Sequence, residues 1–427
     1  MPDTELSFIF VFFTKTMKIY TLFLIGLGFL LSCNNGKKEY QDRITAKLLA
    51  SGSMQRIQDS AITVINHEKM KTIPFREMKH KYKDIRYIPF YSKKPIGDIK
   101  KLIIFDKYVI VLDSRKAESI FIFDLSGNLL HIIADKGGGP REYYGLADMS
   151  ISKRDSLIVI NDRLAPFMLY YTLDGKFVKK TKAAPCFWFE TFNDKIVNLA
   201  GFGQSFSHKM DENFNLIVSV FDSILYKSFP HYPLQVQTVE YRGLSFNYRD
   251  DLLYYSNKCD TIYQVLNDST YTARFVVDQK KSLWQKRNEK IGYDEQSYLV
   301  KELGYTYLTT PILETEHFFS YRMHYGSNGS ILGQIFHYNK RTGELFTRGA
   351  REYPDDGLYI SNVVTPGIMM TVHGNYFVGV FDPDEIDVFV KMIKNDVVFE
   401  NEELSDILRN KVTDELEFIL VMYELQE

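Results

Sequence analysis

The chain has 427 residues, of which 45% are apolar and 25% are charged, so it can form one large or two ordinary globular domains. Its 52 basic and 54 acidic residues give a formal net charge of -2 without a long basic run, which argues against a nucleic-acid-binding protein. Aromatic residues make up 15% of the chain, nearly all Tyr and Phe, and they favour half-buried β-sheet surfaces. Such residues can also bind sugars or peptides, but sheet packing is the simpler interpretation.

The N-terminal region predicts export. Lys18 precedes an apolar run of about 13 residues, which fits a secretory signal peptide and is short for a membrane span of about 20 residues. The run ends in Leu30-Leu31-Ser32-Cys33, which resembles the lipobox of bacterial lipoproteins. That resemblance implies cleavage before Cys33 and acylation of this cysteine, which would anchor the protein in a membrane. The alternative is an uncleaved anchor helix.

The rest of the N-terminal region sets the expected domain boundaries. Residues 1–16 fit no signal peptide, so Met17 is the expected start, and residues 1–33 form the signal region. Residues 34–83 are expected to be a tether and lead-in, and residues 84–427 the folded domain. Asn34, rather than Asp, follows the lipobox cysteine, and by resemblance to sorted lipoproteins this favours the outer membrane.

The three cysteines do not form a metal site by their spacing, and three are too few for a disulfide framework. If Cys33 is lipidated, Cys186 and Cys259 could pair in an oxidising compartment. Two buried free thiols are the alternative.

An internal repeat indicates the fold. Residues 108–113 and 119–130 align with residues 156–161 and 167–178, at a spacing of about 48 residues. Each copy predicts a strand, a polar turn, a strand, a glycine turn and a further strand. The apolar runs are nearly continuous, as expected for strands that are covered on both faces.

The spacing of this repeat predicts a six-bladed β-propeller. Weaker copies occur at residues 252–275 and 318–346, and the two clear copies turn at Ser126-Gly127 and Asp174-Gly175. A period of 40–50 residues with several strands is typical of propeller blades, and about six fit after residue 84. A β-sandwich, the alternative, would have shorter and less regular strand spacing.

Helices are expected at three places in this all-β chain. Residues 279–305 have helical spacing and predict a small helical insertion. Asp382-Pro383 predicts the start of a helix that runs to Ile393, because Asp is a good N-cap and Pro suits the first helical position. Residues 402–412 predict a second short helix, and residues 417–425 a final strand that could close the ring.

A family resemblance adds to this prediction. Residues 88–90, 96–98, 123–128 and 135–143, which end in Gly137-Gly-Gly-Pro-Arg-Glu-Tyr143, resemble the six-bladed β-propeller lipoproteins of gut-type Gram-negative bacteria, related in fold to NHL-repeat propellers. The resemblance covers roughly residues 84–427 and implies export, lipidation and a propeller, without a known ligand or reaction. Arg141 stands where this family usually has glycine, so the backbone there could differ.

Two glycine-rich stretches partly match the patterns of phosphate-binding or nucleotide-binding sites. Gly137 to Pro140 could cradle an anion, but no Lys-Ser/Thr follows, so a close crossing between blades is the better interpretation. Gly201-Phe-Gly203 lacks the third glycine of a dinucleotide site and any surrounding βαβ unit.

No catalytic or metal site is expected from the remaining motifs. His317 and His324 are seven residues apart in a strand-like stretch, so they would lie on opposite faces. The acidic residues Asp382, Asp384, Glu385 and Asp387 fit a helix N-terminus better than a metal site. No cofactor is implied.

Four residues are candidates for ligand binding. Arg141, Glu142 and Tyr143 follow the glycines and could point to one face. Trp188, within Cys186-Phe-Trp-Phe189, could stack on a sugar, although core packing explains it equally well.

The sequence therefore favours a cell-envelope module that binds a small molecule, glycan or peptide, or a protein partner. An enzyme, a hydrolase or lyase with a site in the central channel, is one alternative, and a purely structural partner of an outer-membrane uptake complex is another. Three converging His, Asp or Glu side chains from different blades would favour the enzyme.

Overall fold

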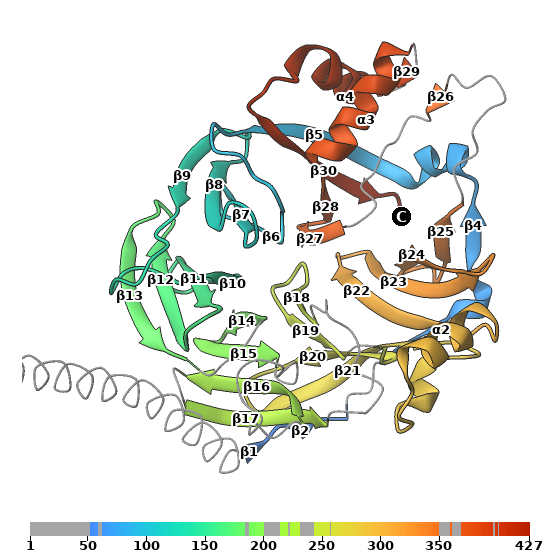
Figure 1. Ribbon diagram of the computed structural model, residues 1–427. Coiled ribbons are helices and arrows are strands. Elements are labelled where there is room, and N and C mark those ends of the chain that lie inside the picture. The colour runs from blue at the N-terminus through green and yellow to red at the C-terminus, as the bar shows by residue number, and fades with distance from the viewer. Residues whose placement is uncertain are drawn as a thin grey trace, which may run out of the picture. The chain divides into compact units, whose positions relative to one another are not determined.

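The computed structural model describes residues 52–58, 62–183, 188–199, 214–220, 223–230, 243–256, 258–349, 359–360, 369–395, 398–399 and 401–427. Most of these residues lie in six antiparallel sheets arranged as a ring, which is a six-bladed β-propeller (Figure 1). No helix in these ranges is long and apolar enough to cross a membrane.

The first two blades correspond to the two clear copies of the sequence repeat, and each has four strands from the centre of the ring outward. Blade 1 consists of β6 (Lys101–Phe105), β7 (Tyr108–Asp113), β8 (Ser119–Asp124) and β9 (Leu129–Ile133). Blade 2 consists of β10 (Leu146–Ser152), β11 (Leu157–Asp162), β12 (Phe167–Thr172) and β13 (Phe177–Lys182). The predicted turn glycines Gly127 and Gly175 have φ values of 87° and 79°, which confirms the two tight hairpins.

The next three blades have the same order of strands. Blade 3 consists of β14 (Phe189–Phe192), β15 (Lys195–Leu199), β16 (Phe214–Val220) and β17 (Ser223–Pro230). Blade 4 consists of β18 (Leu244–Phe246), β19 (Leu252–Tyr255), β20 (Thr261–Val265) and β21 (Thr270–Asp278). Blade 5 consists of β22 (Tyr307–Glu314), β23 (Phe318–Ser327), β24 (Ser330–Asn339) and β25 (Leu345–Arg348). The weaker repeats are therefore blades 4 and 5, whereas blade 3 has no counterpart among the repeats predicted from the sequence.

Blade 6 closes the ring with strands from both ends of the folded domain. It consists of β27 (Met369–His373), β28 (Tyr376–Phe381), β30 (Leu416–Leu425) and, outermost, β5 (Tyr82–Tyr91). The predicted final strand is thus β30, and it pairs antiparallel with β5. Joining the N-terminal and C-terminal strands in one sheet ties the two ends of the ring together.

The segment expected to be a tether and lead-in adds short strands to the outer edges of three blades. These strands are β1 (Gly52–Ser53), β2 (Gln55–Arg56), β3 (Thr63–Asn66) and β4 (Lys71–Ile73). They pair in parallel with β17, β21 and β25, the outermost strands of blades 3, 4 and 5. Two 3-10 helices accompany these strands: η1 (His67–Lys69) lies between β3 and β4, and η2 (Phe75–Lys81) lies between β4 and β5. We call residues 52–73 the strap.

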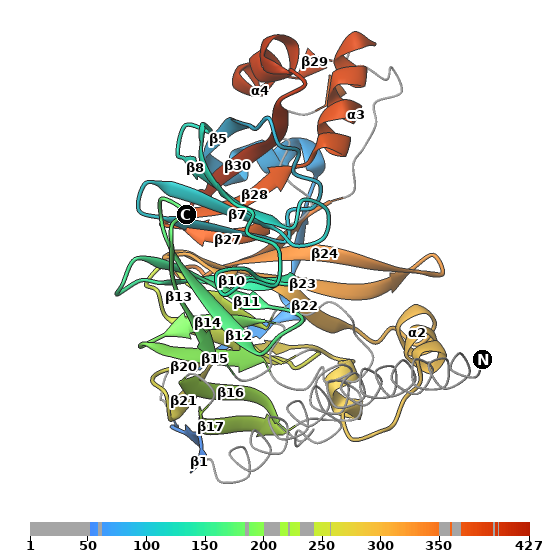
Figure 2. The ribbon, with the colours of Figure 1, turned by 60° about the vertical axis from the view of Figure 1, so that its left-hand side comes forward.

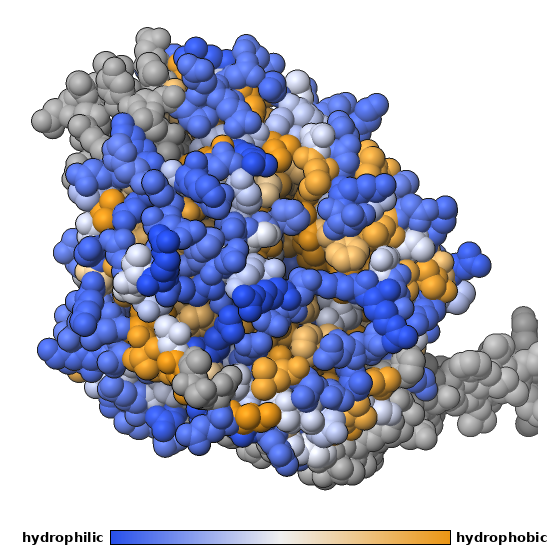
Figure 3. Space-filling model, turned by 180° about the vertical axis from the view of Figure 1, so that it is seen from behind, coloured by the Kyte–Doolittle hydropathy of each residue, from blue (hydrophilic) through white to orange (hydrophobic). Residues whose placement is uncertain are grey.

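The direction of the strands defines two faces of the ring. Neighbouring strands in a blade are antiparallel, so the turns that join strands one and two, or three and four, lie on one face. We call this the turn face, and Figure 3 shows it with hydrophobic patches among mostly hydrophilic residues. The connections between strands two and three, and between blades, lie on the opposite face.

The helices lie on this opposite face, which we call the helix face (Figure 2). The predicted insertion contains η4 (Leu283–Lys286) and α2 (Tyr293–Lys301), between blades 4 and 5. The predicted C-terminal helices are α3 (Pro383–Lys394) and α4 (Glu402–Asp406), with α4 continued by η5 (Ile407–Lys411), between β28 and β30. A two-stranded parallel sheet joins β26 (Tyr359–Ile360) to β29 (Val398–Phe399).

The prediction for the start of α3 is confirmed in detail. Asp382 accepts a hydrogen bond from the backbone of Glu385, whose side chain accepts one from the backbone of Asp382. This capping box satisfies two N–H groups that the helix leaves unpaired. It accounts for Asp382 and Glu385, two of the four acidic residues that the sequence analysis assigned to this end of the helix.

The core lies between the blades rather than inside any one of them. Ile110, Ile122, Met149 and Ile160 belong to one buried cluster shared by blades 1 and 2. A second cluster joins blades 6 and 1, and a third joins blades 3, 4 and 5. The second strands of blades 1 and 2 are buried on both faces, which explains their nearly continuous apolar sequence.

Candidate functional site

The glycine-rich loop between blades 1 and 2 uses its polar groups internally. Glu142 accepts a hydrogen bond from the backbone N–H of Gly139 at 2.7 Å, and a Cβ atom at Gly137 would lie 2.1 Å from its carboxylate. The carboxylate therefore packs directly against the bare backbone of the glycines. These contacts support the interpretation of the loop as a close crossing between blades.

The other two residues of this motif have different surroundings. Tyr143 is fully buried, and its hydroxyl donates to the carbonyl of Glu118 at 2.7 Å. Arg141 has an exposed side chain, its φ is not positive, and its carbonyl accepts from the Tyr171 hydroxyl. The three candidate side chains therefore do not share one environment, and any ligand binding by them remains a prediction.

Trp188 and Cys259 both lie near the large core of blades 3 to 5. Trp188 is half-buried and packs against this core, and its carbonyl accepts from the backbone of Leu199. Cys259 is a buried free thiol, and burial raises its pKa to about 12. Cys33 and Cys186 lie outside the described residues.

Three inner strands bring charged side chains together near the centre of the ring. The Lys101 ammonium lies 2.7 Å from the Glu190 carboxylate and 3.3 Å from that of Asp148. These residues come from β6, β10 and β14, the first strands of three consecutive blades. We call them the inner-strand cluster.

The inner-strand cluster is closed by its own contacts. Glu190 accepts a hydrogen bond from the Ser150 hydroxyl at 2.6 Å, and Asp148 accepts one from the backbone of Phe189 at 3.0 Å. Burial raises the pKa of Glu190 more than Lys101 lowers it. The cluster ties blades 1, 2 and 3 together through two carboxylates and one ammonium.

A serine–histidine pair is also enclosed. The Ser320 hydroxyl lies 2.7 Å from Nδ1 of His337, and both residues are buried. Burial lowers the pKa of His337 to about 3, so its imidazole is neutral at ordinary pH. Phe346, Phe377 and Tyr423 surround the ring, so the pair belongs to the core between blades 5 and 6.

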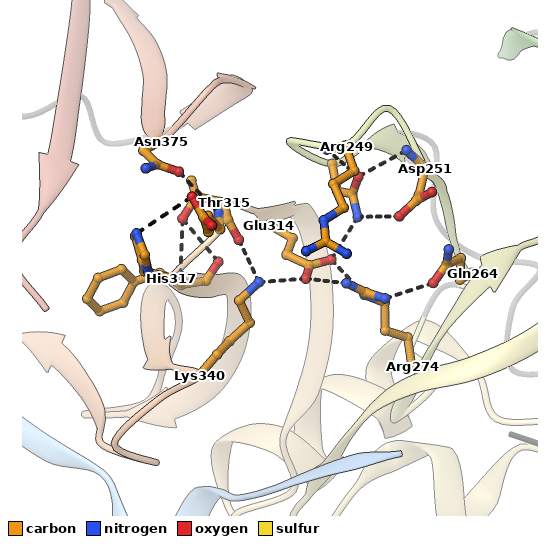
Figure 4. Close-up of polar contacts among 12 residues, drawn as sticks. Arg249, Asp251, Gln264, Arg274, Glu314, Thr315, His317, Lys340 and Asn375 are labelled. Carbon is orange, nitrogen blue, oxygen red and sulfur yellow. Dashed lines mark hydrogen bonds and ion pairs between the residues drawn. The ribbon is translucent and has the colours of Figure 1, made fainter. Parts of the chain in front are cut away.

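The most developed polar site lies on the turn face between blades 4 and 5 (Figure 4). Glu314, the last residue of β22, is fully buried and binds the Arg274 guanidinium through two hydrogen bonds of 2.6 and 2.7 Å. The Lys340 ammonium donates to the same carboxylate at 2.8 Å, and the Asn247 amide donates at 3.1 Å. We call Asn247, Arg274, Glu314 and Lys340 the Glu314 cluster.

This cluster holds two cations around one carboxylate. Burial opposes ionisation of Glu314, but the hydrogen bonds and positive charges of Arg274 and Lys340 outweigh it, so its pKa stays below the usual value. Burial lowers the pKa of Lys340 despite the attraction of Glu314, and Arg274 and Arg249 lower it further. The cluster is therefore rich in positive charge.

The turn from β18 to β19 adds an aromatic ring and a second arginine to the edge of the cluster. The Asn247 side chain accepts hydrogen bonds from the backbone N–H groups of Arg249 and Asp251, which fixes the turn. Tyr248 then lies between two cations, with its ring centre 4.8 Å from the Lys340 ammonium and 5.1 Å from the Arg249 guanidinium. The Arg249 side chain is exposed.

Sequence reasoning did not find the Glu314 cluster. Its members are separated by 26 to 40 positions along the chain, from Asn247 to Arg274, then Glu314, then Lys340. The available signals were the turn sequence Asn247-Tyr-Arg-Asp-Asp251 and a glutamate at the end of an apolar strand. Neither signal shows that the turn and the glutamate lie next to each other in the fold.

The potential metal ligands of the chain have other surroundings. Among the described residues, no group of three or more His, Cys, Asp or Glu side chains could hold a metal ion. His317 instead lies 3.1 Å from the Glu427 carboxylate, while His324 contacts the Tyr307 ring.

Comparison with known proteins places the chain in a family. Residues 62–424 match the family described as "Domain of unknown function (DUF4934)". The chain belongs to this family. No curated protein sequence matches the DUF4934 chain.

Solved structures support the fold of this DUF4934 protein. A Bacteroides fragilis protein that is named as exported has a TM-score of 0.66 at 17% identity, and the match covers 86% of this chain and 100% of that one. A DUF4221 family member from Bacteroides vulgatus has a TM-score of 0.46 at 10% identity, covering 81% and 97%. A virginiamycin B lyase from Staphylococcus aureus has a TM-score of 0.37 at 10% identity, and the match covers 80% of this chain and 99% of that one. Only the first of these likenesses is close enough to carry an argument, and it concerns the fold.

Proposed function

We propose that this DUF4934 protein is an exported lipoprotein of the cell envelope, anchored through Cys33, that acts as a binding module. The signal-like segment before Cys33 supports export, as does the name of the Bacteroides fragilis protein with the same fold. The NHL-like family resemblance and Asn34 support lipidation and the outer membrane. The ligand is a small molecule, glycan or peptide, or the partner is an outer-membrane protein.

The observation that carries the binding function is the contrast between closed and open polar sites. The inner-strand cluster and the Ser320–His337 pair are buried and bonded to their own neighbours. At the Glu314 cluster, by contrast, the Arg249 side chain is exposed beside an aromatic ring. An exposed arginine and a half-buried tyrosine beside a rigid, hydrogen-bonded base are typical of a recognition surface.

The anchor is tested by the mature N-terminus and by fractionation. Mass spectrometry of the membrane-bound protein should find acylated Cys33 as the first residue, and Cys33→Ser should release the protein from membranes. Replacing Ser32 by Ala serves as the control, because a small residue is kept before the cysteine. An unmodified chain that retains residues 1–32 would contradict the lipid anchor.

Binding is tested separately from catalysis. Full-length protein is titrated calorimetrically with galacturonate trimer, galactose trimer and a pentapeptide, and each probe is then analysed by mass spectrometry. We expect at least one probe to bind and all to be recovered unchanged. Conversion of a bound probe to products would favour the hydrolase or lyase alternative.

A further inference from the structure

We propose that the open side of the Glu314 cluster is a site for an oxyanion, a carboxylate or phosphate group carried by a larger ligand. Arg249 and Lys340 would hold the oxyanion, and Tyr248 would contact the rest of the ligand. This inference rests on the proposed binding function and specifies the chemistry of the ligand at that surface.

The first argument is charge. Two cations, Arg274 and Lys340, surround the single buried carboxylate of Glu314, and the exposed Arg249 adds a further positive charge at the edge of the cluster. Glu314 cannot turn outward to neutralise Arg249, because both of its oxygens accept hydrogen bonds inside the cluster. The excess charge therefore lies at the surface.

The second argument is unused donors. Within the described part of the chain, the Arg249 guanidinium makes no hydrogen bond or ion pair, and its contact is the Tyr248 ring. Lys340 uses two of its three N–H donors, on Glu314 at 2.8 Å and on the Thr315 carbonyl at 2.7 Å. A guanidinium fork and a neighbouring ammonium match the geometry of a carboxylate or phosphate.

The third argument is that nearby carboxylates have other partners. Asp250 forms an ion pair with Lys153, and Asp251 accepts from the Asn247 amide at 3.2 Å. The Glu427 side chain pairs with Arg341 and contacts His317, and the Glu316 carboxylate, which acts on Tyr248 from nearby, lies 3.8 Å from the same imidazole. An oxyanion that meets Arg249 would therefore come from outside these groups.

The position of the site favours access by a ligand. Arg249 lies in the β18–β19 turn, and Lys340 in the turn after β24, so both are on the turn face.

The test compares matched pairs of anionic and neutral probes on the purified full-length protein. The pairs are galacturonate trimer with galactose trimer, glucose 6-phosphate with glucose, and a pentapeptide with a free or an amidated C-terminus. We expect at least one anionic probe to bind at least about tenfold more tightly than its neutral partner, with affinity falling as salt is raised. Which pair responds distinguishes carboxylate from phosphate ligands.

The variants assign this preference to the site. Arg249→Ala should weaken binding of the anionic probe at least about tenfold. Arg249→Lys should weaken its binding less, because lysine keeps the positive charge but lacks the forked guanidinium group. Arg154→Ala is the matched control, because Arg154 lies on the same face but is already paired with Asp194. It should leave the affinity unchanged.

The outcomes separate this inference from the proposed function. If a neutral probe bound as tightly as its anionic partner, and Arg249→Ala did not change its affinity, the oxyanion site would be overturned while the binding module would be supported. Failure of the folded protein to bind any of the probes would count against both.

Discussion

Glu314 shows how a single buried carboxylate can organise the side chains of two blades. Two cations and one amide donate to it, and it has no exposure to water. Removing the carboxylate would leave the charges of Arg274 and Lys340 uncompensated in a poorly solvated place. This costs far more free energy of unfolding than breaking an exposed ion pair. The cluster is therefore both a stabilising contact and the rigid base of the proposed site.

Glu314→Ala should lower the free energy of unfolding by about 3–5 kcal/mol, because Arg274 and Lys340 would be left without their carboxylate. Urea denaturation measures this loss. Glu289→Ala is the control, since Glu289 is half-exposed and pairs only with Lys286, and it should change stability by less than about 0.5 kcal/mol. Equal effects of the two substitutions would show that the Glu314 cluster is not coupled as described.

Asp260 predicts a pH-dependent term in stability. Burial raises its pKa to about 6 from 3.8, and Asp278 adds to the increase, while the Ser282 hydroxyl opposes it. The folded chain thus holds the proton more tightly than the unfolded chain. Its contribution to stability is present below about pH 4 and is lost as the pH rises to about 6.

Asp260→Asn should remove this term, because an amide oxygen can still accept from Ser282 and Gln279 but carries no charge. Relative to the wild type, the variant should gain up to about 3 kcal/mol between pH 4 and pH 7. Urea denaturation at several pH values measures the difference in the free energy of unfolding between the variant and the wild type. The pKa of His67 is lowered to about 4, so His67 contributes to stability with the opposite pH dependence. This contribution is the same in both proteins and is removed by the subtraction. Asp155→Asn, at an exposed site, should give a flat difference.

At the scale of elements, the strap gives the lead-in segment a structural role. β3 extends the sheet of blade 4, and Ile65 joins the core shared by blades 3 to 5. The neighbouring His67 lies 3.0 Å from the Tyr321 hydroxyl, in blade 5. Residues before the expected start of the propeller thus contribute to its core.

Ile65→Ala should therefore lower the free energy of unfolding by about 2–5 kcal/mol, since a fully buried side chain is lost. Val64, the adjacent residue, is 60% exposed, and Val64→Ala should cost no more than about 0.5 kcal/mol. Thermal and urea unfolding can measure both. If the two variants had the same stability, the strap would not be packed as described.

The success of sequence reasoning differed between elements for physical reasons. Blades 1 and 2 have complete apolar strands and glycine turns, so their periodicity was visible. In blade 3, β14 and β15 have only four and five residues, and no glycine-type turn joins them. The turn residues there are Asn193 and Asp194, both with positive φ, so the turn is formed without glycine.

At the scale of the whole molecule, blade 6 determines whether the ring stays closed. Phe90 of β5 stacks on Phe418 of β30 with ring centres 4.6 Å apart, and it meets Phe123 of blade 1 edge-on at 5.1 Å. This contact joins the first and last strands of the propeller to the neighbouring blade. Loss of packing here should affect the entire ring.

Phe90→Ala should lower the free energy of unfolding by about 3–5 kcal/mol and shift one cooperative transition, followed by both circular dichroism and tryptophan fluorescence. Leu125→Ala, at an exposed turn of blade 1, is the control and should change little. A new early transition in the variant, seen by one probe alone, would mean that blade 6 opens independently of the rest.

The local features could be predicted from the sequence alone: the strands and glycine turns of blades 1 and 2, the cap of α3, the helical insertion and the closing strand. Each depends on residues close together in the chain, whose side-chain period and backbone preferences are readable directly. Which charged groups come into contact depends on how the blades pack against each other. Asn247 and Lys340 are 93 positions apart, and they come together around Glu314 because blades 4 and 5 stack face to face. Stacking depends on the combined shape of all the strands, so no local pattern encodes it.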